Sequence, residues 1–201
     1  MFIDTKLFEL IHALAGRSPV GDAALVFFAR VLPYFLAIGF FAFLADVRGF
    51  RARFFVFAQT ALAVLLARGI ATEVLAHYFY RARPFETLGF SPLITETSSS
   101  MPSGHAALFF ALACAMWYVS RRWGAAYLFS ASVMALARIA CGVHYPSDIV
   151  AGAAIGIASA YVVAKALAPY DPALREKAKE ASSEELSPEA AVPLNFPGEV
   201  R

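Results

Sequence analysis

The sequence predicts an all-α fold: a polytopic membrane helix bundle with about five transmembrane helices and one N-terminal interfacial helix. The 201 residues are 60% hydrophobic and only 16% charged, whereas globular chains are about 45–50% apolar and about 25% charged. Apolar runs also recur along the chain with the roughly 20-residue length that a helix needs to cross a bilayer. The net charge of +2 is too small and too dispersed to suggest a nucleic-acid partner.

The chain begins with an amphipathic segment. It lacks the basic n-region and long apolar h-region of a cleavable signal peptide. Its apolar residues recur at helical spacing: Phe2, Ile3, Leu7, Leu10, Ile11 and Leu14. We therefore expect residues 3–16 to form a helix that lies in the membrane interface and does not cross it.

Five apolar segments follow, and we expect each to span the membrane. They are residues 22–45, 54–76, 105–119, 125–141 and 149–168. The third is short unless the preceding loop contributes a turn, and Pro33 can kink the first, which membrane helices tolerate. Residues 1–170 then form one membrane-embedded domain. Residues 171–201 are polar and rich in Pro, Glu and Ser, so we expect a partly helical and then disordered tail.

The basic residues predict the orientation of the bundle. They gather in the connections after the first, third and fifth spans: Arg48, Arg51, Arg53, Arg121, Arg122, Lys165, Arg175, Lys177 and Lys179. The positive-inside rule assigns these connections, and the tail, to the cytoplasm. The loop 77–104 and the turn 142–148 then share the outer face.

The outer segments carry a set of polar residues that suits phosphoryl transfer: His77, Arg81, Arg83, Ser103, His105, Arg138, His144 and Asp148. Arginines from different loops, with the backbone N–H groups at residues 103–104, would enclose a phosphate. One histidine could act as nucleophile while another acts as general acid. The Asp148 carboxylate, four residues after His144, could accept the Nδ1–H of that histidine and fix its tautomer.

Each of these residues also has a simpler interpretation. Arg83 and Arg138 could be interface anchors that extend to lipid headgroups. Asp148 could only cap the last span, as Ser103 could cap the third. A metal site formed by His105, His144 and Asp148 is a further alternative, but nearby arginines would oppose a cation.

Taken together, these residues resemble the motifs of the type 2 phosphatidic acid phosphatase superfamily, whose members are membrane lipid phosphatases. Arg83-Pro84 match its Lys–six residues–Arg–Pro motif, and Pro102 to His105 match Pro–Ser–Gly–His. The third motif, Ser–Arg–five residues–His–three residues–Asp, is matched from position 138 onwards with its spacing intact. The resemblance covers residues 22–168. Ala76 stands at the lysine position of the first motif and Ala137 at the serine position of the third.

The resemblance implies a mechanism and a set of site residues. His144 is implied as the nucleophile that forms a phosphohistidine, with Asp148 orienting it and His105 protonating the leaving oxygen. The implied phosphate-binding residues are Arg83, Ser103, Gly104 and Arg138. Arg81, His77 and Glu73 are candidates for reshaping the corner that lacks the motif lysine. No metal and no cofactor are implied, and the sequence predicts no particular oligomeric state.

Within the superfamily, the segments "LPYFLAIGFFAF" and "RARPFETLGFSPLI" are similar to the undecaprenyl-diphosphate phosphatase branch. This implies cleavage of undecaprenyl diphosphate at the outer face of a bacterial inner membrane, as a step in recycling the cell-wall lipid carrier. Phosphatidylglycerol phosphate, phosphatidic acid and lipid A are alternative substrates. A vanadate-dependent haloperoxidase, whose site is similar, and a non-enzymatic binder or transporter of anionic lipids are more distant alternatives.

Overall fold

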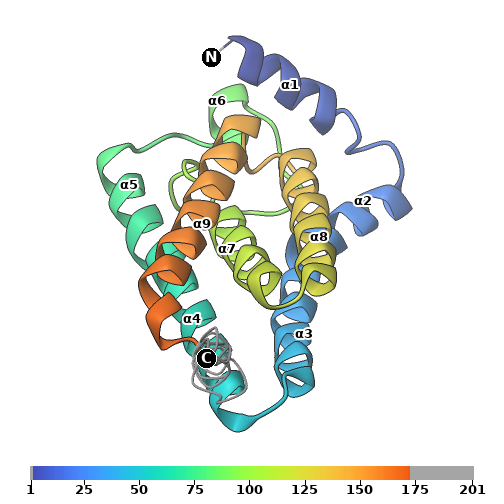
Figure 1. Cartoon of the computed structure of the whole chain (residues 1–201). Helices are drawn as coiled ribbons and strands as arrows, with labels where there is room; N and C mark the ends of the chain where they lie inside the picture. Colours follow the sequence, from blue (N-terminus) through green and yellow to red (C-terminus); the bar gives the residue numbers. More distant parts are fainter. Residues whose placement is uncertain (1, 173–201) are drawn as a thin grey trace, which may run out of the picture.

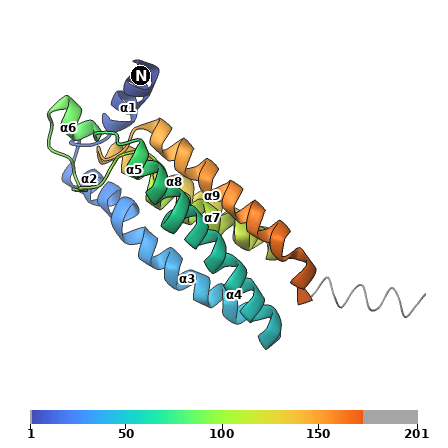
Figure 2. The same ribbon diagram turned by 90° about the vertical axis from the view of Figure 1, so that its left-hand side faces the viewer.

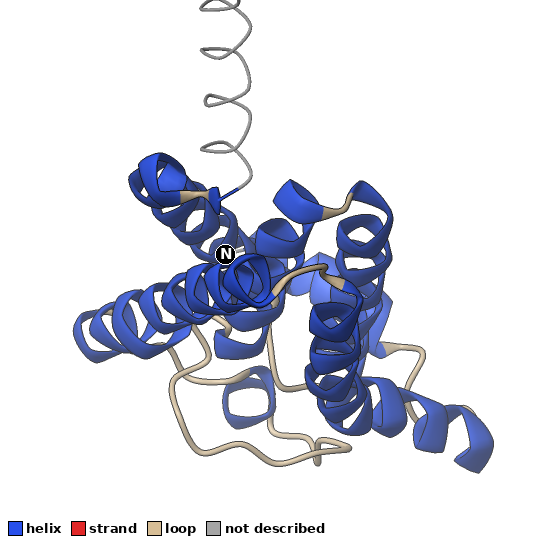
Figure 3. Ribbon diagram, turned by 60° about the horizontal axis from the view of Figure 1, so that its bottom comes forward, coloured by secondary structure: helices blue, strands red, loops and turns tan. Residues whose placement is uncertain are grey.

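A computed structural model describes residues 2–172, and within this range all regular secondary structure is helical (Figures 1 and 3). The elements in chain order are α1 (Phe2–His12), α2 (Pro19–Val26), η1 (Phe27–Val31), α3 (Leu32–Asp46), α4 (Phe50–Val64), η2 (Leu65–Ala71), α5 (Thr72–Tyr78), α6 (Pro84–Leu88), α7 (Gly104–Val119), α8 (Arg121–Ala140), α9 (Pro146–Leu167) and η3 (Ala168–Tyr170). The all-α prediction is confirmed. The tail predicted at 171–201 lies, from residue 173 on, outside the described residues.

The five predicted spans are all helical. Four helices in the described range are long and apolar enough to cross a membrane: 19–46, 50–78, 121–140 and 146–170. The fifth, α7, has 16 residues, because the loop before it adds no helical turn. All of the predicted boundaries are within four residues of the observed ones. The last two spans begin earlier than predicted because Arg121 follows Ser120 directly into α8, and Pro146 opens α9.

The short helix α7 lies at the centre of the bundle (Figure 1), where it packs against α8, α9 and α4. Small residues bring α9 close to it. A Cβ at Gly152 or Gly156 would collide with the backbone oxygens of Ser103 and Ala107, respectively. Such close approach through small residues is typical of membrane helix pairs. It positions the start of α9 directly beside the start of α7.

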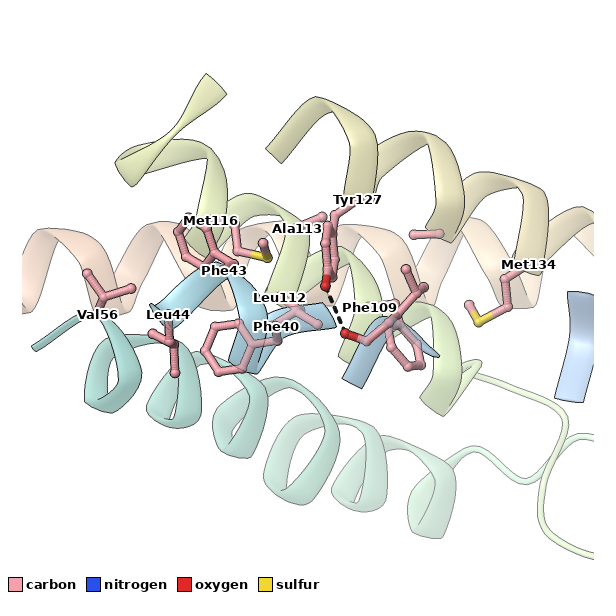
Figure 4. Close-up of a cluster of buried hydrophobic side chains, with 12 residues drawn as sticks. Phe40, Phe43, Leu44, Val56, Phe109, Leu112, Ala113, Met116, Tyr127 and Met134 are labelled. Atoms are coloured by element: carbon pink, nitrogen blue, oxygen red, sulfur yellow. Dashed lines mark hydrogen bonds between the residues drawn. The ribbon is translucent and has the colours of Figure 1, made fainter. Parts of the chain in front are cut away.

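An apolar core fills the half of the bundle away from the long loops. Side chains from α3, α4, α7 and α8 form it, among them Phe43, Met116 and Met134, which are fully buried (Figure 4). The Tyr127 hydroxyl donates a hydrogen bond of 2.9 Å to the carbonyl oxygen of Leu36, so this buried hydroxyl is satisfied. This core fixes the helices that carry the polar end of the molecule.

Both of the first two long helices contain a π-helical turn. In η1 the Leu32 N–H bonds to Phe27 O, five residues earlier, immediately before Pro33. The bend predicted at Pro33 is thus accompanied by a change in helical hydrogen bonding. In η2, the N–H and the hydroxyl of Thr72 both bond to Ala67 O, the latter at 2.7 Å. π-helical turns of this kind are rare and occur frequently at functional sites.

The N-terminal helix α1 differs from the prediction in length and surroundings. It ends at His12, and residues 13–16 form a turn. The helix docks on the end of the bundle beside α6 (Figures 1 and 2). Phe8 is 1% exposed and packs with Ile139 and Tyr145, while His12 Nδ1 lies 2.8 Å from Ala140 O. Protein contacts therefore hold α1, and its position in a membrane interface stays a prediction.

Candidate active site

The predicted site residues converge where α7 and α9 begin and α8 ends. Arg83, Ser103, Arg138, His144 and Asp148 are each at most 2% exposed. Burying charged side chains is unfavourable unless they are paired, and four of these five residues can carry charge. Chain segments that are distant in sequence thus form one polar cluster at the end of the bundle that carries α1 and α6.

His144 is held by both of its ring nitrogens. Nδ1 lies 2.9 Å from the carbonyl oxygen of Ser100, and Nε2 lies 3.2 Å from the Oγ of Ser103. Because a carbonyl oxygen can only accept, Nδ1 carries the proton and Nε2 presents its lone pair. Burial lowers the pKa of His144 to about 4, with the charges of Arg138 and Arg83 acting in the same direction. The imidazole is therefore neutral at neutral pH, as a nucleophile must be.

Asp148 lies in the first turn of α9, as predicted, but it does not form the expected hydrogen bond to His144. Its Oδ2 is 3.7 Å from His144 Nδ1, too long for a hydrogen bond. That oxygen instead accepts from the Ser100 hydroxyl at 2.5 Å and from the Tyr145 N–H at 2.8 Å. The Tyr145 N–H and the Ser100 hydroxyl therefore occupy the lone pairs of Asp148 Oδ2. Ser100 links Asp148 to His144, because its hydroxyl bonds to the carboxylate and its carbonyl oxygen accepts from the imidazole.

Arg81 completes this carboxylate network. Its Nη1 donates to Asp148 Oδ1 and to the Ser147 hydroxyl, both at 2.7 Å, and its Nη2 donates to Asp4 Oδ2 at 2.7 Å. The guanidinium also stacks over the Tyr145 ring, 4.1 Å from its centroid. Arg81 was predicted as a possible substrate-binding residue, but here it is an internal clamp between α1 and α9.

Arg83 is anchored to the loop that precedes α7. Its guanidinium donates to Ser98 O (2.8 Å), Val143 O (2.7 Å), Ser98 Oγ (3.1 Å) and Ser99 O (3.2 Å). A guanidinium has five N–H donors, so one remains for a ligand. Arg83 thereby ties the loop to the segment that carries His144.

Arg138 keeps an unused donor. Its Nη2 bonds to Glu96 Oε1 at 2.6 Å and its Nη1 to Ala29 O at 3.2 Å. Its Nε is the one buried side-chain nitrogen or oxygen in the described part of the chain with no hydrogen-bond partner. Buried polar groups are rarely left unpaired. An oxygen atom of a bound phosphate would satisfy it.

Arg138 and His105 line a cavity of about 490 Å³, together with Arg30, Glu96 and apolar side chains of α3 and α7. Leu108 and Phe109, which line its apolar side, also line a smaller, wholly apolar pocket of about 190 Å³ between α3, α4 and α7. An arginine-lined cavity beside an apolar pocket suits a ligand with an anionic head and a hydrocarbon tail.

Ser103 and Gly104 open α7 at this cluster. The Ser103 hydroxyl accepts from the Ala106 N–H at 3.5 Å, and the backbone N–H of Ser103 donates to Asp148 O at 3.0 Å. The capping interpretation is therefore correct, and it coexists with the contact to His144. The N-terminus of α7 also offers backbone N–H groups and a favourable dipole for an anion.

Two other predicted residues lie away from the cluster. His77 is exposed and its ring meets that of Tyr78. Glu73 is exposed and forms an ion pair with Arg68, a residue that the sequence analysis missed. Both residues project from the same long helix, and neither lines the cavity that holds His105.

Several residues that complete the site were not predicted from the sequence: Asp4, Arg30, Arg68, Glu96 and Ser100. Burial raises the pKa of Glu96, but its hydrogen bond to Arg138 and the charges of Arg138 and Arg83 together outweigh burial and lower the pKa overall, so Glu96 is ionised at neutral pH. Arg30 and Arg68 carried a signal in the sequence, because charged residues inside apolar spans are costly and usually functional. In residues 2–172, no group of three His, Cys, Asp or Glu side chains is placed to hold a metal ion.

Comparison with known proteins adds to this geometry. The model of the PAP2 superfamily matches residues 57–169. The "Bacitracin transport permease protein BcrC" of Bacillus licheniformis is 29% identical over 163 residues, covering 80% of this chain and 79% of that protein. The "Putative undecaprenyl-diphosphatase YbjG" of Escherichia coli is 28% identical over 170 residues, covering 82% and 84%. The crystal structure of LpxE from Aquifex aeolicus superposes with a TM-score of 0.66 at 26% identity, covering 80% and 94%.

Proposed function

Since this chain belongs to the PAP2 superfamily of membrane lipid phosphatases, we propose that it removes the terminal phosphate of a lipid diphosphate. The proposed substrate is undecaprenyl diphosphate, which would yield undecaprenyl phosphate and inorganic phosphate. The observation that carries this proposal is the arrangement of His144 in a buried, arginine-lined cluster, with its proton fixed on Nδ1 and its Nε2 lone pair facing the Ser103 hydroxyl.

In the proposed mechanism, Nε2 of His144 attacks the terminal phosphorus. The bond from phosphorus to the bridging oxygen breaks, and His105 gives a proton to that oxygen. Water then attacks the phosphohistidine, His105 takes the proton of the water, and phosphate leaves with His144 restored. The Ser103 hydroxyl must turn away from Nε2 when the phosphoryl group binds, because the two now lie 3.2 Å apart.

The phosphate would be bound by donors that are still unsatisfied. These are the Nε of Arg138, which has no partner, the remaining N–H of Arg83 and the backbone N–H of Gly104. Such donors stabilise the charge of the equatorial oxygens in the transition state. Asp148 would act as a positioning residue through Ser100 and Arg81.

Two observations support the choice of an isoprenoid diphosphate. One relative carries the name of an undecaprenyl-diphosphatase, and the cavity adjoins an apolar pocket between α3, α4 and α7 that could receive a hydrocarbon chain. Phosphatidylglycerol phosphate, phosphatidic acid and lipid A remain alternative substrates. The other relative is named as a transport permease, so the experiment below also separates hydrolysis from transport.

We further propose that the site faces the outside of a bacterial inner membrane, with the C-terminal tail in the cytoplasm. Arg48 belongs to the α3–α4 connection, and Arg51 and Arg53 follow it in the first turn of α4. This connection lies at the end of the bundle opposite to α1 and α6 (Figure 2). The positive-inside rule assigns that opposite end to the cytoplasm.

The proposal is tested by phosphate release from purified protein in detergent with EDTA present. The rate of phosphate release is compared between the wild type and His144→Ala for three substrates: undecaprenyl diphosphate, phosphatidylglycerol phosphate and phosphatidic acid. We expect EDTA-resistant release, fastest from the diphosphate, that is lost in His144→Ala and kept in His77→Ala, the matched change of an exposed histidine. Loss of activity in EDTA, or equal activity of His144→Ala, would contradict it.

A further inference from the structure

Two arginines inside the first two spans have no role in the proposed mechanism. Arg30 lies in η1 and Arg68 in η2, the two π-helical turns of the molecule's described part. Each directly follows an alanine with no exposed surface, Ala29 or Ala67. A charged side chain in a membrane span is unfavourable and marks a functional site more often than a structural one. The repeated pattern therefore calls for a common ligand.

Arg30 is an exposed residue that borders part of the proposed active site. It lines the same 490 Å³ space as His105, Glu96 and Arg138. Within residues 2–172, no hydrogen bond or ion pair to the Arg30 guanidinium is found. Glu96 is already bonded to Arg138 at 2.6 Å. An uncompensated cation thus borders the space in which the phosphate would bind.

Arg68 lies against the start of α7 from the second span. A Cβ atom at Gly104 would be only 2.5 Å from Arg68 Nε, so the guanidinium rests directly on the Gly104 backbone. The side chain is 43% exposed and forms an ion pair with Glu73. Gly104 precedes His105, so Arg68 approaches the proposed acid from the side of α4 while Arg30 approaches it from the side of α3.

The positions of these cations fit a ligand with two phosphates. The first phosphate has its own donors in Arg83, Arg138 and the N-terminus of α7. A second phosphate must adjoin the first, and it must also lie towards the hydrocarbon tail. Arg30 meets both conditions, because its cavity shares Leu108 and Phe109 with the apolar pocket between α3 and α4. Ala76, at the position of the motif lysine, offers no charge that could serve instead.

We propose that Arg30 and Arg68 form a second anion subsite that binds the lipid-proximal phosphate and selects lipid diphosphates over lipid monophosphates. This inference rests on the proposed phosphatase function. Before substrate binds, Glu73 neutralises Arg68; the inner phosphate displaces this carboxylate. As the bridging bond breaks, negative charge develops on that same phosphate. The arginines therefore lower both the KM and the barrier for diphosphate substrates.

The test compares farnesyl diphosphate with farnesyl phosphate, which share one tail and differ by the inner phosphate. The full chain in detergent is assayed as wild type, Arg30→Gln, Arg68→Gln and Arg68→Lys. A hydrogen bond between charged groups is lost in each glutamine variant, so we expect the ratio of kcat/KM for diphosphate over monophosphate to fall about tenfold or more. Arg68→Lys should recover part of the ratio, because the charge is kept.

Two further variants sharpen the result. Glu73→Gln removes the carboxylate that competes for Arg68, and we expect a lower KM for the diphosphate. Arg51→Gln is the matched control, because Arg51 lies at the opposite end of the helix 50–78 that also contains Arg68. It should leave the diphosphate-to-monophosphate ratio of kcat/KM unchanged. The arginines could instead bind the phosphate of a bilayer lipid, and phosphatidylglycerol added to the micelles tests this alternative. In that case the glutamine variants would change the hydrolysis of farnesyl diphosphate and of farnesyl phosphate to the same extent.

The outcomes separate the two proposals. Hydrolysis of neither substrate by the wild type would contradict the phosphatase function, and with it the subsite. The subsite alone would be overturned if the wild type hydrolyses both substrates and the glutamine variants keep the same ratio of kcat/KM. Equal loss of activity on both substrates in these variants would overturn it as well. A ratio that falls in Arg30→Gln and Arg68→Gln but not in Arg51→Gln would support it.

Discussion

At the scale of residues, the site depends on one buried histidine whose protonation is controlled by its surroundings. Ser100 fixes the tautomer of His144 through a carbonyl oxygen, and Asp148 acts on it through Ser100. The expected contact between Asp148 and His144 was inferred from a spacing of four residues. The structure uses that spacing to cap α9 instead, since Oδ2 accepts the Tyr145 N–H.

The first prediction concerns the pH dependence of stability. The pKa of His144 is about 4 in the folded protein against 6.5 in an unfolded chain, so the unfolded state binds more protons between these values. Stability is therefore full above pH 6.5 and falls towards pH 4, by on the order of 3 kcal/mol from this group. Thermal unfolding in detergent should show a Tm that drops across this range. The drop should shrink in His144→Gln; an identical pH profile in both proteins would refute the assignment.

The second prediction concerns Asp148→Asn. The change leaves Arg81 with Asp4 as its remaining carboxylate partner and removes the charge that three donors share. Breaking a buried ion pair of this kind should cost on the order of 3 kcal/mol. We expect a lower Tm and a reduced kcat with a smaller change in KM. Ser147→Ala, which removes a neutral partner of Arg81, is the control and should have the smaller effect on both quantities.

At the scale of elements, α1 is bonded to the segments that carry the candidate site. Asp4 accepts from the Ser147 hydroxyl at 2.6 Å, from the Ser147 N–H at 3.0 Å and from Arg81 at 2.7 Å. The start of α9, which carries Asp148, is therefore linked to the N-terminal helix. Helical periodicity alone could not show this, because the hydrogen-bond partners of α1 lie 77 to 143 residues away in the chain.

The third prediction follows from this docking. Phe8→Ala removes the buried ring that packs between Ile139 and Tyr145, at a cost of about 3–5 kcal/mol. We expect a lower Tm, cleavage of α1 by added protease and a reduced kcat, because Arg81 loses its fixed partner. Ile3→Ala changes a side chain that is 74% exposed and should leave all three unchanged. A Phe8→Ala protein with wild-type stability would show that α1 is not held by these contacts.

Much of the fold could be predicted at this scale because the physical constraint is strong. A span needs about 20 apolar residues, and each of the five predicted segments is helical. The boundaries moved where local caps decide them, as at Pro146. The π-helical turns could not be foreseen, since they depend on hydrogen bonds five residues apart that apolar composition does not encode. Arg30 and Arg68 were missed although a charged residue inside an apolar span is itself a signal of function.

At the scale of the whole molecule, the two ends of the bundle differ: one end carries the cavity and the other carries the basic connections. The motif residues could be predicted from sequence because their spacing is diagnostic. Glu96 and Ser100 could not, because their roles arise from a loop that Arg83 holds in place. The apolar pocket that is proposed to receive the substrate's tail likewise depends on tertiary packing, because three helices form it.

The fourth prediction concerns orientation in the cell membrane. In a protein whose Cys114 and Cys141 are replaced by Ala, Thr97→Cys introduces an exposed thiol in the loop before α7, and Arg48→Cys introduces one in the α3–α4 connection. An impermeant maleimide added to intact cells should label the first thiol and not the second. The opposite pattern would contradict the assignment of the site to the outer face.

The central claim, that His144 carries the phosphoryl group, is tested most directly by trapping the intermediate. The enzyme is mixed with lipid diphosphate labelled at the terminal phosphate, quenched in base within one turnover, and digested for identification of the labelled peptide. We predict a base-stable, acid-labile label on His144, formed with EDTA present and absent from His144→Ala. A label on another residue, or turnover without any labelled protein, would contradict the account.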